Sequence, residues 1–159
     1  MRRIGLLLGA LSLAAFAGGV LTAAPANAKA TTETIHVSDV TESHRDSNPC
    51  SGAKGTFTIT YDGVFHSTEL PNGTSWFTGT LHGTASFVPN NPTQPSYAGK
   101  FTAWFGDENN LKNEVEHETF RAKLLGTDGS VLMAHETAHM GTSANGPAVS
   151  FDKARFTCP

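Results

Sequence analysis

The sequence predicts an all-β domain, and three observations favour this class. Apolar and polar residues alternate with period two along much of the chain. Threonine supplies 19 of residues 29–159, and aromatic residues dominate the apolar set; both fit a pleated surface better than a helix. Short clusters of Gly, Pro, Asn and Asp separate the alternating runs. We therefore expect a single antiparallel, up-and-down barrel of six to eight strands, with a sandwich as the second choice.

The N-terminal segment 1–28 has the pattern of a secretory signal peptide. Two arginines come first, an apolar stretch follows, and Ala26-Asn27-Ala28 forms an A-x-A cleavage site. The remaining chain of about 131 residues is long enough for one domain with its own core. We expect a secreted, extracellular protein with a flexible polar lead-in at 29–47 and one barrel domain at 48–159.

The composition of the mature chain excludes two partner classes. Nine Lys and Arg stand against fourteen Asp and Glu, so the formal net charge is about −5. No basic run occurs, which argues against nucleic acid as a partner. No apolar run of about 18 residues follows residue 28, so we expect no membrane span.

The two cysteines, Cys50 and Cys158, both lie in the mature chain. In an oxidising compartment only one pairing is open to them. We expect a disulfide that ties the start of the domain to its C-terminus and acts as a structural staple.

The strands are expected from residue 55 onward, where alternation begins. Asp62-Gly63 permits a bend or bulge, and Gly79 and Gly83 share the apolar face of their run, which predicts sharp curvature. The expected strands are 55–66, 74–88, 97–105, 114–125, 131–142 and 148–158, and Thr34–Val37 is a further candidate.

Residues 114–125 admit two interpretations. As a strand they place Glu114, Glu116 and Glu118 on one face, which we expect to be solvated. As a helix they would be capped by Asn113. The neighbouring strands and the Gly126-Thr127-Asp128-Gly129 turn signal favour the strand.

The segment His135-Glu136-Thr137-Ala138-His139 matches H-E-x-x-H. On a helix, the two histidines would bind zinc and the glutamate would act as general base. The expected third ligand is missing from the extended motif, since Thr142 and Asn145 occupy the positions for Gly and His. As a strand, the histidines would lie about 13 Å apart and share no ion. We favour the strand.

On that strand Glu136 shares a face with Leu, Ala and Met residues. A carboxylate on an apolar face needs a partner or a proton. Either Arg121 or Arg155 pairs with it, or it faces a ligand in the mouth of the barrel.

Seven histidines are spread along the chain. Side chains from different strands converge inside a barrel, so we take His66, His82 and His117, together with Glu136, as candidate binding residues. No catalytic residue, metal ligand or cofactor is assigned, except zinc on His135 and His139 under the hydrolase hypothesis.

Several segments resemble a group of small secreted actinobacterial proteins of uncharacterised function. They include Asn48-Pro49-Cys50, Tyr61–His66, Gly126–Ser130, His135–His139 and Val149–Lys153. The resemblance implies a β-rich, barrel-like domain with one disulfide, and it implies no activity.

Three functions remain open. A non-enzymatic, lipocalin-like barrel that binds a small apolar or amphipathic molecule or an extracellular protein is the leading hypothesis. The alternatives are a zinc-dependent hydrolase and a structural envelope protein without a pocket. The sequence does not decide the ligand or the oligomeric state.

Overall fold

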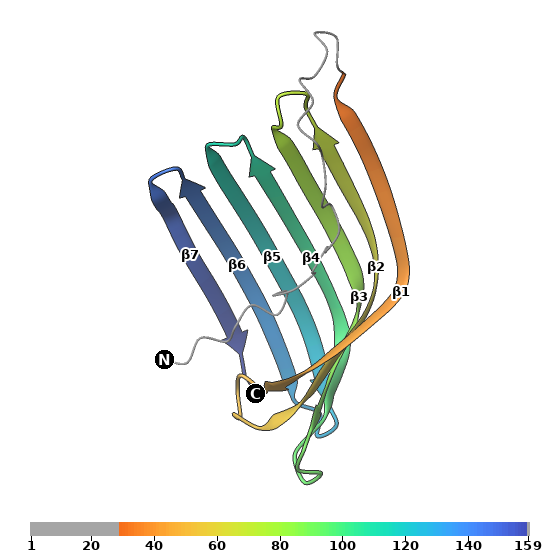
Figure 1. Cartoon of the computed structure of the whole chain (residues 1–159). Coiled ribbons are helices and arrows are strands. Elements are labelled where there is room, and N and C mark those ends of the chain that lie inside the picture. Colours follow the sequence, from red (N-terminus) through yellow and green to blue (C-terminus); the bar gives the residue numbers. More distant parts are fainter. Residues whose placement is uncertain (1–28, 159) are drawn as a thin grey trace.

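The computed structural model describes residues 29–158 and shows one antiparallel sheet of seven strands (Figure 1). Each strand pairs with the next along the chain, which confirms the all-β, up-and-down prediction. Among these residues no helix is long and apolar enough to cross a bilayer. The predicted signal peptide lies outside the described residues. The strands are β1 (Thr31–Ser47), β2 (Lys54–Glu69), β3 (Ser75–Pro89), β4 (Tyr97–Asn109), β5 (Asn113–Gly126), β6 (Val131–Ser143) and β7 (Gly146–Thr157).

The sheet is curled but not closed, so the barrel-like fold is open between β1 and β7. In the described chain β1 pairs only with β2, and β7 only with β6. With seven antiparallel strands β1 and β7 run in the same direction, so closure would require a parallel pairing of the two edges. The edges are joined at one end only, where the predicted Cys50–Cys158 disulfide links the β1–β2 turn to the end of β7.

Residues 31–47, expected as a flexible lead-in, form the strand β1. Its polar residues fit a strand because threonines and serines pair across to β2, as in the 2.9 Å hydrogen bond between the hydroxyls of Thr41 and Thr60. A bulge interrupts the pairing between Val37 and Val40, and Asp39 adopts a φ of 55° there. Figure 1 shows β1 bending across the sheet toward the end of β7.

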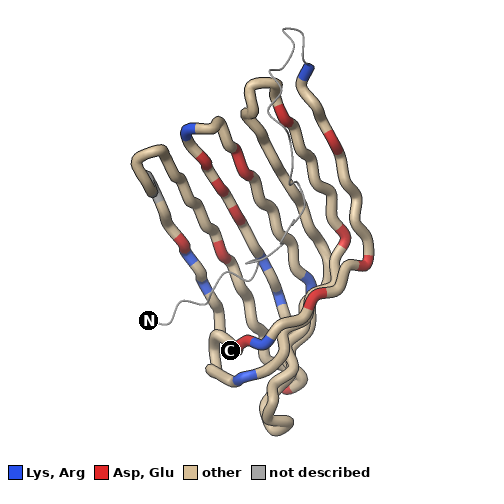
Figure 2. The backbone as a smooth tube through the Cα atoms, viewed as in Figure 1, with Lys and Arg blue, Asp and Glu red and all other residues tan. Residues whose placement is uncertain are grey.

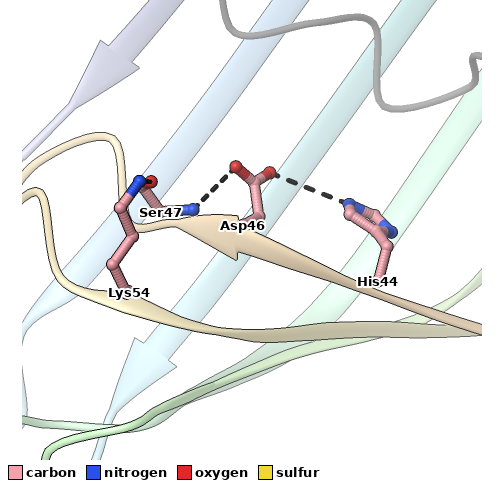
Figure 3. A network of polar contacts seen from close by, with 4 residues as sticks. All are labelled: His44, Asp46, Ser47 and Lys54. Atoms are coloured by element: carbon pink, nitrogen blue, oxygen red, sulfur yellow. Dashed lines mark hydrogen bonds and ion pairs between the residues drawn. The ribbon is translucent and has the colours of Figure 1, made fainter.

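A polar network holds the end of the β1–β2 hairpin beside the disulfide (Figure 3). Asp46 accepts a 2.6 Å hydrogen bond from the backbone N–H of Ser47 and lies 3.7 Å from His44. Lys54 donates a 2.6 Å hydrogen bond to the Ser47 hydroxyl. Asn48 is buried and accepts hydrogen bonds from two turn N–H groups. This end of the molecule is therefore fastened by both covalent and polar contacts.

The core lies on the concave face of the sheet, where alternate residues of each strand point inward. Leu81 is fully buried, and Phe101 stacks on Phe120 with ring centroids 5.6 Å apart. Gly79 leaves room for the ring of Phe105 to pack over β3, because a Cβ there would overlap that ring. The buried apolar residues are Ile59, Tyr61, Phe65, Leu81, Ala85, Phe87, Tyr97, Phe101, Ala103, Phe120, Ala122, Leu124 and Leu132.

Candidate ligand-binding site

The concave face differs between its two ends. At the end fastened by the disulfide, core side chains leave only a small gap of about 50 Å³. At the opposite end, where β1 and β7 are not joined, a pocket of about 480 Å³ remains. A volume of this size falls in the range of small-molecule sites. We call these two regions the closed end and the open end.

One side of the pocket is an aromatic wall made by Phe65, Phe77 and Phe105. The three residues come from β2, β3 and β4. Each has inward parity, which means that it occupies one of the alternate strand positions whose side chains point to the concave face. Their ring centroids lie 5.7–5.8 Å apart in every pair. This is contact distance for aromatic pairs, so the wall is a continuous apolar surface.

The other side is an acidic wall made by carboxylates of β4, β5 and β7. The register pairs Asp107 with Glu116, and it aligns Glu118 with Ala138 and then Asp152 along one row across the sheet. In Figure 2 the acidic segment of β5 precedes its basic segment, so negative charge gathers toward the open end. All members of the acidic wall line the pocket: Asp107, Glu114, Glu116, Glu118 and Asp152.

The acidic wall is electrostatically strained in the free protein. Burial, together with the nearby Glu136, Asp152 and Glu116, raises the pKa of Glu118 to about 7. The pKa of Asp107 is also raised, by burial and by three neighbouring glutamates. Crowded carboxylates disfavour one another's ionised form. A cation in the pocket would relieve this repulsion.

Glu136 lies on the concave face below the pocket and is only 8% exposed. Burial and the charge of Asp152 raise its pKa. The suggested partners Arg121 and Arg155 have the opposite parity and point to the convex face, so the predicted ion pair does not form. Among the described residues no ion pair involves Glu136. Its unpartnered carboxyl adds to the negative potential of the open end.

Within the part of the chain that the structure describes, no lysine or arginine lines the pocket beside the acidic wall. By strand parity, none of the lysines and arginines in β1–β7 points toward the concave face. The described ion pairs within 4.0 Å involve only histidines, namely His44 with Asp46 and His82 with Asp62. The open end is therefore a negatively charged cavity with one apolar side.

Three carboxylates of the acidic wall also offer a possible metal site. Oxygens of Asp107, Glu114 and Glu116 lie within 4.8 Å of one another. Carboxylate oxygens are the ligands of Ca²⁺. All three are partly or fully exposed, and exposed acidic groups of this kind also occur without an ion.

The three candidate histidines do not join Glu136. His66, His82 and His117 all point to the convex face and are exposed. The ring of His66 hydrogen-bonds the Thr34 hydroxyl at 3.0 Å, and His82 lies 3.9 Å from Asp62. Of the four predicted binding residues, only Glu136 points to the concave face, and it lies below the pocket. Among the three histidines, His117 is one of the residues that border the pocket.

His117 instead pairs with His139 across β5 and β6. Their Nδ1 atoms lie 3.0 Å apart, and His139 stacks on Phe151. Both histidines point to the convex face, and both residues also border the open-end pocket.

The H-E-x-x-H segment lies within β6, as the strand interpretation predicted. His135 and His139 share the convex face about 13 Å apart at 3.3 Å per residue, and Glu136 points the other way. The zinc-hydrolase hypothesis requires two imidazoles on one ion beside the glutamate, and this strand does not provide that geometry.

The acidic wall is the feature that sequence reasoning missed. Residues 113–126 are a strand, as favoured, but Glu114, Glu116 and Glu118 face the pocket and not simply solvent. A signal was present, because these residues share parity with Phe120 and Leu124, which are core residues. Extending the inward face of β5 toward its N-terminus would have revealed the wall.

Comparison of the chain with protein families, with curated proteins and with solved structures finds no match. The resemblance to small secreted actinobacterial proteins therefore stays a prediction.

Proposed function

We propose that this chain is a secreted binding protein whose open end holds a small organic cation with an apolar portion. The observation that carries the proposal is that two unlike walls border one cavity of about 480 Å³, with Phe105 paired in register with Glu118. The aromatic wall suits an apolar body, and the acidic wall suits a positive head group.

The chemistry of the ligand follows from the groups that each wall offers. Carboxylates bind ammonium and guanidinium groups through charge-assisted hydrogen bonds. The faces of Phe77 and Phe105 attract a cation that has lost part of its water shell. An anionic ligand would meet five carboxylates and no lysine or arginine, so the pocket discriminates against it. We therefore expect amphipathic amines or quaternary ammonium compounds.

Isothermal titration calorimetry with two matched probes tests the proposal. Octyltrimethylammonium and octyl sulfate share an alkyl chain and differ in the sign of the head group, and both are used below their micelle concentrations. We expect the cation to bind the mature protein and the anion not to bind. The double variant Glu116→Gln/Glu118→Gln should weaken binding of the cation by about tenfold or more.

The matched control is Glu108→Gln, because Glu108 is exposed, has convex parity on β4 and is the weakest of the three glutamates that raise the pKa of Asp107. It should change affinity by less than about twofold. Equal binding of octyl sulfate, or unchanged affinity in the double variant, would contradict the proposal. A site that takes Ca²⁺ alone and rejects octyltrimethylammonium would show that the carboxylates form a metal site instead.

A further inference from the structure

The convex face carries charge of the opposite sign to the acidic wall. Lys100, Arg121, Lys123 and Arg155 all have outward parity and are exposed. Together with His135 they form a continuous surface across β4–β7, which we call the basic band. Figure 2 shows the basic segments of β5 and β7 nearer the closed end than the acidic ones.

The strand register assembles the basic band from residues far apart in sequence. Arg121 lies opposite His135, and His135 lies opposite Arg155. Lys100 lies directly opposite Lys123 in the next row. Neighbouring strands are about 4.8 Å apart, so these charges stand close together. Like charges placed opposite each other destabilise a sheet, and such a placement calls for an anionic partner.

The protein itself supplies little negative charge there. Among the described residues of β4–β7, Glu108 is the one carboxylate with outward parity. Glu108 lies near the C-terminal end of β4, whereas Lys100 lies near its start. The closest acidic group on β2 is Asp62, which is engaged with His82. No lysine or arginine of residues 29–158 lies within 4.0 Å of a carboxylate.

The shape of the surface points to an extended partner. A shallow groove of about 780 Å³ runs along the basic band from β3 to β7. Its lining contains no exposed Trp, Tyr or Phe, since Phe101 faces the core, and the exposed Trp104 of the same face lies outside the lining, two residues beyond Thr102. Single-stranded nucleic acids are bound on exposed aromatic rings where their bases stack. A polyanion that lacks bases fits this surface better.

We propose that the basic band binds a linear phosphodiester polymer without bases, such as a polyol phosphate chain. Guanidinium and ammonium groups bind phosphate oxygens through charge-assisted hydrogen bonds, and Arg121 and Arg155 offer the two-pronged geometry. The band has four permanent cations, and each lies no more than two strands from the next. This spacing suits a polymer that carries one negative charge on each repeating unit. This site is separate from the open-end pocket and does not depend on its ligand.

Fluorescence anisotropy with labelled poly(glycerol phosphate) tests this inference on the mature protein. We expect binding that weakens with salt, with a slope of log K against log salt of about −3 for four neutralised phosphates. The variant Arg121→Gln/Arg155→Gln should weaken binding by at least about tenfold. Lys112→Gln, which removes one charge from the β4–β5 turn, is the control and should bind as the parent does.

Two further probes define the partner. Single-stranded poly(dT) and poly(glutamate) should bind at least about tenfold more weakly than poly(glycerol phosphate). Equal or tighter binding of either probe, a salt slope near zero, or unchanged affinity in the double arginine variant would overturn the inference. Because the double variant leaves the concave face intact, it should still bind octyltrimethylammonium, which separates failure of this site from failure of the pocket.

Discussion

The closed and open ends of the concave face are built on the same seven strands but have opposite properties. Along β5 the inward residues begin as Glu114, Glu116 and Glu118 and continue as Phe120 and Leu124. The change from carboxylate to apolar side chain within one strand coincides with the change from open cavity to filled core. One end therefore provides stability, and the other end retains the crowded charges and free volume that a binding site requires.

The largest expected effect comes from releasing the closed end. The disulfide spans 108 residues, and constraint of such a loop in the unfolded chain is worth about 4–5 kcal/mol. The double variant Cys50→Ala/Cys158→Ala should lose most of that free energy of unfolding in guanidinium denaturation. If the free energy of unfolding fell by less than about 1 kcal/mol, the stability of the curled sheet would not depend on the disulfide.

A pair of phenylalanine variants contrasts the two ends directly. Phe101 is 3% exposed and packs in the closed end, so Phe101→Ala should cost about 3–4 kcal/mol of stability. Phe77 belongs to the aromatic wall and is only partly buried. Phe77→Ala should cost about 1–2 kcal/mol and weaken binding of octyltrimethylammonium. If Phe101→Ala and Phe77→Ala lost similar stability and Phe77→Ala left ligand affinity unchanged, the two ends would not differ in function as described.

A smaller effect is expected from Glu118→Gln, and its sign depends on pH. The pKa of Glu118 is about 7 in the folded chain against an ordinary 4.5, so the folded state holds this proton more tightly. Its destabilising contribution grows as pH rises from about 4.5 to 7 and is complete above that range. The variant should exceed the parent in stability by about 1 kcal/mol at pH 8 and match it near pH 4.

Thermal and chemical unfolding at both pH values measure this difference. Glu108→Gln serves as the reference on the convex face, and its stability relative to the parent should not depend on pH in this way. A Glu118→Gln variant less stable than the parent at pH 8 would mean that the acidic wall is not repulsive.

Local patterns predicted most of the fold. Alternation and turn residues identified six of the seven strands, and the glycine turns at Gly73 and Gly129 adopt the positive φ of 84° that such turns need. The strand at His135–His139 was also expected. Of the polar strand β1 only Thr34–Val37 was a strand candidate, because neither face of β1 is strongly apolar and its pairing with β2 rests on hydroxyl contacts across the sheet.

The site was less predictable because it depends on register and curvature. Alternation within β6 shows that Glu136 shares a face with apolar residues. Placing Arg121 and Arg155 on the other face also requires the register of β5 and β7 against β6. The basic band was invisible in a chain with no basic run, since its cations come from three strands. Whether seven strands close or stay open is decided by the relation of β1 to β7, which no local pattern records.

An NMR titration of uniformly ¹⁵N-labelled protein with octyltrimethylammonium tests the binding proposal most directly. The largest amide shift changes should occur at the open end, at Phe77, Phe105, Glu116, Glu118 and Asp152. Amides of the closed end, such as those of Leu124 and Leu132, should move little. Saturable shifts confined to the open end would support the proposed site. Shifts centred on the closed end or the convex face, or no saturable shifts at all, would contradict it.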